Sequence, residues 1–278
     1  MRKIKIVTDS SSDVPSLSGV ELASTPLKII TEEREFIDND ALDIAEMVTY
    51  LEKYKGRSSS ACPSPNDFLN AFGDAEEVYC VTITSGLSGC YNAAVAAKKI
   101  YEEENPTRRV LVIDSLSTGP EMALIIEKLR AFILEGKSFE EIEKGITKYK
   151  KKTGLLFMLE SMKNLANNGR VSRLTAKLAG VMSIRVIGIA SDKGELAPLD
   201  KPRGSKLALT RILSHLEALG YRGGKLHIAH CFNHSFANEL KDKLIAKFPK
   251  AEIAVRACRG LCSFYAEKGG LLVGFEKA

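Results

Sequence analysis

Side chains suited to a binding site gather where the first apolar segment of the chain ends. The segment 4–7 runs directly into Thr8, Asp9, Ser10 and Ser11. Because open α/β sheets bind ligands at the carboxyl ends of their strands, this polar block predicts a site. Ser and Asp also bond to nearby backbone N–H groups in turns, so each of these side chains also has a purely structural interpretation.

A second polar loop spans residues 84–89, Thr-Ser-Gly-Leu-Ser-Gly, between a predicted strand and a predicted helix. Free N–H groups at a helix start, glycines that allow close approach, and the hydroxyls of Ser85 and Ser88 together suit a carboxylate or a phosphate. Gly89 stands where the helix begins. The competing interpretation is that Ser88 only caps the helix and Gly86 only turns the chain.

Two further loops contribute one candidate each. Ser60 lies in the Ser- and Pro-rich stretch 58–65, which by composition alone is an ordinary loop. Arg170 lies in the Asn- and Gly-punctuated segment 164–180. A planar guanidinium there can hold a carboxylate or orient a loop that does. An arginine in such a segment is more often an ordinary surface residue than a ligand-binding one.

The elements that position these loops alternate between strand and helix. Strands at 77–83 and 109–113 flank a helix at 90–103, a repeat typical of a parallel sheet with right-handed crossovers. Ser64 with Pro65, and the capping box from Ser138 to Glu141, mark two helix starts. Further helices are predicted at 40–54, with Asp40 as cap, and at 65–72, 121–134 and 138–150.

The second half of the chain has a different pattern of elements. Strands are predicted at 154–159, 184–190, 195–198, 225–229, 252–257 and 271–275, helices at 205–219 and 234–248, and a hairpin turn at 191–194. The fold class is therefore α/β with two domains. We expect an N-terminal parallel-sheet α/β domain at residues 1–153 and a C-terminal mixed-sheet α/β domain at residues 154–278.

Composition narrows the function classes. A chain of 278 residues that is 45% hydrophobic can bury a substantial core. The net charge of +5, from 40 basic and 35 acidic residues, is spread along the sequence and argues against a nucleic-acid partner. Six cysteines without a C-x-x-C pair indicate reduced thiols. No apolar run approaches the ~18 residues of a membrane span, so we expect a cytoplasmic protein.

Neither a metal site nor a nucleotide site is expected. His227, His230 and His234, with Cys231 between them, invite a metal interpretation. On a strand, however, positions 227 and 230 point to opposite faces, and the spacing matches no usual zinc pattern, so structural histidines are favoured. The sequence also contains neither G-x-G-x-x-G nor a P-loop. No cofactor is expected.

Four of these segments together resemble the DegV family of bacterial fatty-acid-binding proteins. Residues 8–15 are similar to the family's T-D-S-(S/T)-x-D-(I/V)-P, and residues 85–94 to its S-S-x-L-S-G-(T/S)-Y-x-x-A. The stretch 60–65 is similar in part to T-S-Q-P-S-P, and the stretch 165–172 to L-x-x-G-G-R-I-S. The motifs occur in family order across roughly residues 4–275.

The resemblance implies a lipid carrier. A long-chain fatty acid would lie in the apolar interior between the domains, with Ser60, Ser85, Ser88 and Gly89 around its carboxylate and Arg170 beside them. The carrier would present that carboxylate to a dihydroxyacetone-kinase-like fatty acid kinase and would itself have no catalytic residue. The family's C-terminal H-x-G-P-G is replaced here by residues 258–262, Cys-Arg-Gly-Leu-Cys. Cys258 therefore stands where the resemblance places a histidine beside the ligand head group.

The alternative is a serine hydrolase acting on a small ester or lipid through Ser88. Its elbow motif, G-x-S-x-G, is incomplete because position 90 is Cys where the second glycine belongs. The general base would be His215, His227, His230 or His234, and none of them has a convincing loop context. We therefore favour the carrier.

Overall fold

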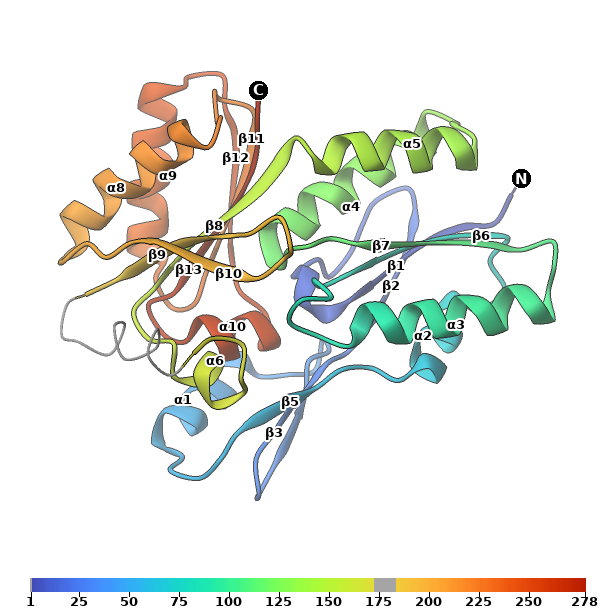
Figure 1. Cartoon of the computed structure of the whole chain (residues 1–278), viewed down its shortest axis with the longest axis horizontal. Coiled ribbons are helices and arrows are strands. Elements are labelled where there is room, and N and C mark those ends of the chain that lie inside the picture. Colours follow the sequence, from blue (N-terminus) through green and yellow to red (C-terminus); the bar gives the residue numbers. More distant parts are fainter. Residues whose placement is uncertain (1, 173–183) are drawn as a thin grey trace.

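The computed structural model describes residues 2–172 and 184–278 and arranges them as three sheets with covering helices (Figure 1). The strands are β1 (Ile4–Asp9), β2 (Glu21–Thr25), β3 (Lys28–Ile30), β4 (Glu35–Ile37), β5 (Ser59–Ala61), β6 (Glu77–Thr82), β7 (Arg109–Asp114), β8 (Thr153–Leu159), β9 (Val186–Ala190), β10 (Leu196–Asp200), β11 (Lys225–His230), β12 (Glu252–Ala257) and β13 (Leu271–Glu276). The helices are η1 (Ser10–Ser12), α1 (Ile44–Lys53), α2 (Pro65–Phe72), α3 (Cys90–Glu104), α4 (Gly119–Leu134), α5 (Phe139–Lys150), α6 (Lys163–Asn167), α8 (Ser205–Ala218), α9 (His234–Lys247) and α10 (Gly260–Ala266).

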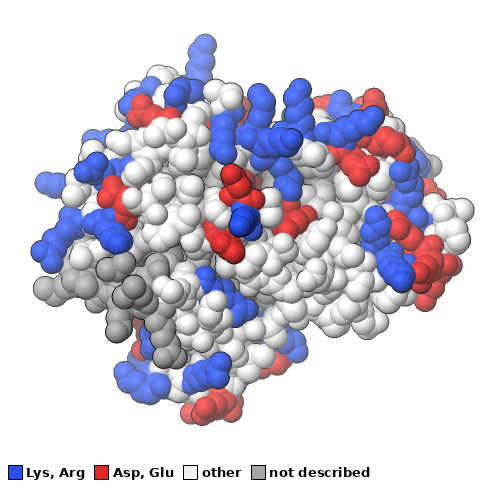
Figure 2. Space-filling view, in the orientation of Figure 1, with Lys and Arg blue, Asp and Glu red and all other residues white. Residues whose placement is uncertain are grey.

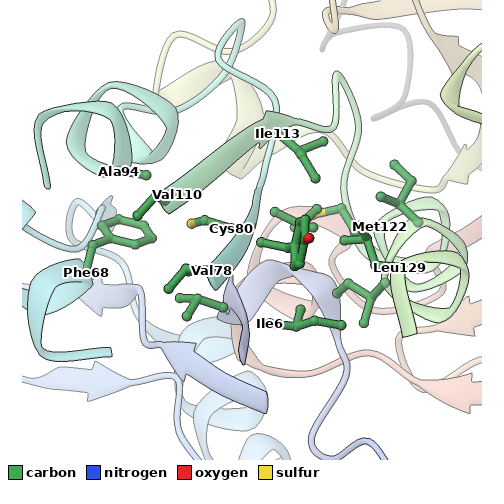
Figure 3. Close-up of a cluster of buried hydrophobic side chains, with 14 of the residues drawn as sticks. Ile6, Phe68, Val78, Cys80, Ala94, Val110, Ile113, Met122 and Leu129 are labelled. Atoms are coloured by element: carbon green, nitrogen blue, oxygen red, sulfur yellow. The ribbon is translucent and has the colours of Figure 1, made fainter. Parts of the chain in front are cut away.

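The first sheet has the order β2-β1-β6-β7, and all of its neighbouring strands are parallel. Its strands are apolar because helices cover both faces. Figure 3 shows Phe68 and Ala94, from α2 and α3, on one side of the strands and Met122 and Leu129, from α4, on the other. The predicted parallel α/β sheet is confirmed.

The second sheet has the order β10-β9-β8-β13-β11-β12. Only the pair of β11 and β12 is parallel, so this sheet is mixed, as predicted. Helices α8 and α9 pack on one face, against Leu156 and Met158 of β8. The alternate residues of β8 point to the opposite face, where they share a core cluster with residues of β3, α1 and α10. Strand β13 lies in the middle of the sheet, between β8 and β11.

Helix α4 joins the two sheets, because it packs against β6 and also against β13 and β11. Gly274 of β13 permits this contact: a Cβ atom there would lie 2.4 Å from the backbone nitrogen of Glu121. All strands of the first sheet precede residue 115, and all strands of the second follow residue 152. We propose the boundary between the two domains at residues 153–154, at the start of β8.

Local signals placed most helix ends correctly. Ser64 and Ser138 each form a complete capping box, with Asp67 and Glu141 respectively, and start α2 and α5 as predicted. One cap was wrong. Asp43, and not Asp40, caps α1 through a bond from the backbone nitrogen of Glu46, 2.9 Å long. Asp40 lies outside the helix and pairs with Arg259 instead.

A third, antiparallel sheet of β4-β3-β5 was not predicted, and neither was α10. The strands of this sheet are three residues long. In β3 and β4 only one residue is buried, which is too few to give a detectable alternation of apolar and polar residues. In Figure 1 this sheet lies below the two larger ones, beside α1 and α6. The part of the predicted Asn- and Gly-punctuated segment that runs over 173–180 lies outside the described residues.

Charged side chains of both signs are mixed over the face that Figure 2 shows, both at its rim and near its centre. No helix within residues 2–172 and 184–278 is long and apolar enough to cross a membrane.

Candidate ligand-binding cavity

A cavity of about 310 Å³ lies between the second sheet, α10 and the loop that follows β6. Its volume falls within the range of small-molecule sites in proteins. Its lining residues are Leu27, Ser60, Ala61, Cys62, Ile83, Leu87, Ser88, Gly89, Thr118, Leu155, Phe157, Leu159, Leu165, Arg170, Leu196, Leu261, Cys262, Tyr265, Ala266 and Leu272. Most of them are apolar.

Strand β8 builds the deep apolar wall. Its alternate residues Leu155, Phe157 and Leu159 face the cavity and are all buried. Leu272 of β13 and Leu196 of β10 extend this wall on either side. The pleat of the sheet therefore presents a continuous hydrocarbon surface to whatever occupies the cavity.

Polar side chains gather at the solvent end of the cavity. The hydroxyls of Ser60 and Tyr265 lie 2.7 Å apart. Arg170 donates through Nε to the carbonyl of Leu87, 3.2 Å away, and through Nη1 to the carbonyl of Asn168. Within the described part of the chain, Arg170 forms no ion pair with a carboxylate. Its positive charge is therefore available to an anionic ligand at this end.

The start of α3 forms the other side of the same opening. Ser88 donates to the sulfur of Cys90 at 3.2 Å, and its oxygen accepts the backbone N–H of Cys90 at 3.4 Å. Gly89 is exposed beside it, and a Cβ atom there would lie 3.1 Å from the Cys62 sulfur. Backbone N–H groups at the N-terminus of this 15-residue helix favour negative charge.

The structure brings together Ser60, Ser88, Gly89 and Arg170 in the lining, and their role in binding remains a prediction. Two candidates lie elsewhere. Ser85 is exposed and outside the lining, because its backbone N–H turns toward Asp114. Cys258 is buried in the core beside the cavity, where its N–H bonds to the carbonyl of His230.

Tyr265, Cys62, Thr118 and Cys262 line the cavity and were missed as candidates. Tyr265 and Cys262 lie on α10, a helix that no local sequence pattern predicts. Cys62 lies two residues after Ser60, in the loop that the sequence did single out. Its position close to the hydroxyl of Ser60 in the sequence was the signal that could have identified it as a candidate.

The N-terminal polar block lies outside the lining and positions the residues that form it. Asp9 is buried, and its carboxylate accepts the backbone N–H of Ile83 at 2.7 Å. It also accepts the N–H and the hydroxyl of Ser11. Burial raises the pKa of Asp9 to about 6, against the effect of these hydrogen bonds. The hydroxyl of Thr8 bonds to the carbonyl of Asp9.

Ser10 and Ser11 form hydrogen bonds to three residues that line the cavity. The Ser10 hydroxyl accepts the backbone N–H of Leu27 at 3.0 Å. The carbonyl of Ser11 accepts from Thr118 and from Cys262, both at 3.4 Å. Leu27, Thr118 and Cys262 all line the cavity. The block therefore acts on the site by fixing its walls, not by direct contact with the cavity.

Two buried carboxylates fix α10. Asp38 accepts the backbone N–H groups of Gly260 and Leu261, each at 2.9 Å. Gly260 is required for this approach, because a Cβ atom there would lie 2.6 Å from Asp38 Oδ1. Asp13 accepts the N–H of Arg259 at 2.9 Å through Oδ1, while its buried Oδ2 has no hydrogen-bond partner among the described residues. Burial, with Asp38 nearby, raises the pKa of Asp13 to about 7.

Asp13 is expected to make the free energy of unfolding depend on pH. Its pKa is higher in the folded state than in the unfolded state, so its contribution is fully present below the unfolded value and is lost as the pH rises through about 7. Relative to wild type, Asp13→Asn should therefore gain about 1 to 2 kcal/mol in unfolding free energy between pH 5.5 and pH 8. Urea denaturation at the two pH values measures this difference.

The matched control for Asp13 is Asp192→Asn, in the exposed turn between β9 and β10. Asn tolerates the left-handed conformation of residue 13, where φ is 57°, so backbone strain does not confuse the comparison. If wild type and Asp13→Asn lose stability in parallel as the pH rises, Asp13 does not titrate as described.

The four histidines of the chain have partners away from Ser88. His215 contacts Asp200, His227 contacts Glu127, His230 accepts from the N–H of Asn233, and His234 contacts Asn238. None of them lines the cavity. The hydrolase alternative therefore lacks the nucleophile and base pair that it requires. Among residues 2–172 and 184–278, no group of three His, Cys, Asp or Glu residues is arranged to hold a metal ion.

Comparison with known proteins gives matches along nearly the entire chain. A family profile described as "Uncharacterised protein, DegV family" matches residues 3–278. A DegV domain-containing protein of Streptococcus pneumoniae is 42% identical over 276 residues, which are 98% of each chain.

Two solved structures share the fold closely. A DegV family protein from Eubacterium eligens, loaded with heptadecanoic acid, is 45% identical with a TM-score of 0.97, over 99% of this chain and 100% of the other. The fatty acid kinase B3 protein of Streptococcus pneumoniae, loaded with linoleic acid, is 42% identical with a TM-score of 0.98, over 100% of both chains.

Proposed function

Because the chain belongs to the DegV family, we propose that it binds a long-chain fatty acid in the cavity between the second sheet, α10 and the loop after β6. The acyl chain would lie along β8 and β13, and the carboxylate would lie at the solvent end, near Ser60, Ser88, Gly89 and Arg170. Two structural neighbours that are over 40% identical were solved with fatty acids bound, which supports this proposal.

The observation that carries the proposal is the division of the cavity into two chemical zones. The residues of β8 in the wall are buried and apolar, whereas Ser60, Ser88 and Arg170 are half-buried at the opening. A fatty acid has the same division along its length. An enclosed apolar cavity with a few polar groups at one end is the usual form of such a site.

The acyl chain supplies the affinity and the head group sets the orientation. At ~0.8 kcal/mol per buried methylene, about 14 methylenes give roughly 11 kcal/mol before ordering costs. A charge-assisted hydrogen bond to the carboxylate contributes about 1.5 to 3 kcal/mol. The loss of one contact at the polar end therefore weakens binding without abolishing it, because most of the affinity comes from the apolar wall.

Ser60→Ala and Ser88→Ala are each expected to weaken fatty-acid binding by about 1 to 2 kcal/mol, roughly tenfold, because one donor is lost while the acyl contribution persists. Titration with a fluorescent fatty acid measures the change. The control is Ser85→Ala, in the same loop but outside the lining, which should bind as wild type does. If Ser60→Ala and Ser88→Ala match Ser85→Ala, both serines have structural roles only.

The test of the proposed function is lipid extraction. Protein expressed in a bacterial host and purified without detergent should retain close to one fatty acid per chain, identified by mass spectrometry of an organic extract. An extract without stoichiometric lipid, from a protein that also fails to bind added palmitic acid, would overturn the proposal.

The position of the polar end at the solvent opening suits a carrier that is not itself the catalyst. We propose that the bound carboxylate is presented there to a partner fatty acid kinase, in keeping with the likeness to the fatty acid kinase B3 protein. A mixture of the loaded chain, ATP and such a kinase should consume ATP, and the chain alone should not.

A further inference from the structure

Two cysteines meet at the solvent end of the cavity. Cys62 follows β5, is exposed and lines the cavity. Cys90 is the first residue of α3 and is buried. The Cys62 sulfur lies against Gly89, the residue before Cys90: a Cβ atom on Gly89 would lie 3.1 Å from it, so the two cysteines are neighbours at the start of α3. Segments 28 residues apart in sequence thus bring an accessible and an inaccessible sulfur together.

We propose that Cys62 and Cys90 form a peroxide-sensitive thiol pair, in which Cys62 is oxidised first and Cys90 then closes a disulfide with it. The pairing follows the arrangement of known redox sensors, in which an accessible thiolate stands next to a resolving thiol. The four other cysteines are all buried, so none of them offers an accessible thiol.

The surroundings of Cys62 favour its thiolate. The neighbouring Cys90 thiol and the backbone N–H groups of Cys62 and Gly89 lower the pKa of Cys62 to about 6. The N-terminus of α3 adds a favourable partial charge. Burial instead raises the pKa of Cys80 and Cys258 well above the usual value. Oxidation should therefore be selective for Cys62.

The reaction balances with hydrogen peroxide as the oxidant. The Cys62 thiolate attacks one peroxide oxygen, the O–O bond breaks, and hydroxide leaves and takes up a proton to become water. The Cys90 sulfur then attacks the resulting sulfenic acid, the S–O bond breaks, and a second water leaves with the Cys90 proton. Two thiols and one peroxide thus give one disulfide and two waters.

The disulfide would alter the polar end of the cavity. It would tie the end of β5, the strand that carries Ser60, to the first turn of α3, beside Ser88 and Gly89. The sulfur of Cys62 would then stay over the N–H groups that an anion would use. This consequence rests on the proposed function: oxidation should lower fatty-acid affinity by about tenfold, the loss of one head-group contact, and reduction should restore it.

The test uses the full chain treated with hydrogen peroxide, blocked with a thiol reagent and mapped by mass spectrometry without reduction. A cross-linked peptide joining residues 62 and 90 is expected in wild type and absent in Cys62→Ser. In Cys90→Ser, dimedone should instead trap a sulfenic acid on Cys62. Cys231→Ala removes a buried cysteine of a different core cluster and should retain the cross-link.

Palmitic acid binding, measured before and after oxidation, separates the two proposals. If reduced protein binds no palmitic acid, the proposed function fails while the cross-link is still assessed by mass. Over-oxidation of Cys62 without a cross-link, or a disulfide only between two chains, would overturn the thiol pair. An intact cross-link with unchanged palmitic acid affinity would overturn its coupling to the cavity. Should Cys90→Ser fail to fold, the pH dependence of Cys62 alkylation in wild type, half-maximal near pH 6, tests the thiolate independently.

Discussion

Leu196→Trp is expected to lower fatty-acid affinity by roughly two orders of magnitude without unfolding the protein. Leu196 lies on β10, the edge strand of the second sheet, and lines the cavity. A Trp ring that excludes about four methylenes removes about 3 kcal/mol of acyl burial. Aromatic residues suit edge strands, so the fold should tolerate the change. Titration with palmitic acid and extraction of retained lipid both measure the effect.

The matched control is Leu199→Trp. Leu199 lies on the same strand but is 44% exposed and is not part of the lining. It should bind palmitic acid as wild type does. Equal losses in the two variants would mean that β10 affects binding through the fold, and equal retention would place the acyl chain elsewhere.

Asp9→Ala is expected to lower the free energy of unfolding by about 3 kcal/mol or more. The change removes the acceptor of three donors: the N–H of Ile83 and the N–H and hydroxyl of Ser11, and the hydroxyl keeps only a weak acceptor, the sulfur of Met122. A buried donor without a partner costs about 1 to 3 kcal/mol. Removal of a buried carboxylate with a raised pKa offsets part of this cost. Because Ile83 lines the cavity, fatty-acid affinity should fall as well.

Urea denaturation at pH 7 measures the first effect, and Asp192→Ala is its control. Asp192 is an exposed turn residue, and its replacement should change stability by less than about 0.5 kcal/mol. An Asp9→Ala protein as stable as the control would show that the N-terminal block is not the anchor described.

Elements whose signals are local could be predicted from sequence. Helix α2 begins where expected because Ser64, Pro65 and Asp67 lie within four residues of one another. Helix α10 could not be predicted in this way. Its N–H groups are satisfied by Asp38, a residue 222 positions earlier in the chain. No window of sequence around Gly260 contains the group that starts the helix.

The difference between local sequence signals and long-range contacts also explains which site residues could be predicted. Ser60, Ser88 and Arg170 were found because each lies in a recognisable loop. Tyr265 was missed because it reaches the cavity on α10, and its hydroxyl partner Ser60 is 205 residues away. The polar block was found, but its role was not, because the groups that it anchors at residues 27, 83, 118 and 262 come from four distant segments.

Because β13 lies in the middle of the second sheet, the cavity is incomplete until this strand has been synthesised. A nascent chain whose residues 271–276 are still inside the ribosome has β8 and β11 without the strand that joins them. It also lacks Leu272, part of the cavity wall. Long-range strand pairing of this kind forms late. Loading with lipid must therefore follow translation of the last strand, and until then the apolar face of β8 is a surface on which chaperones can act.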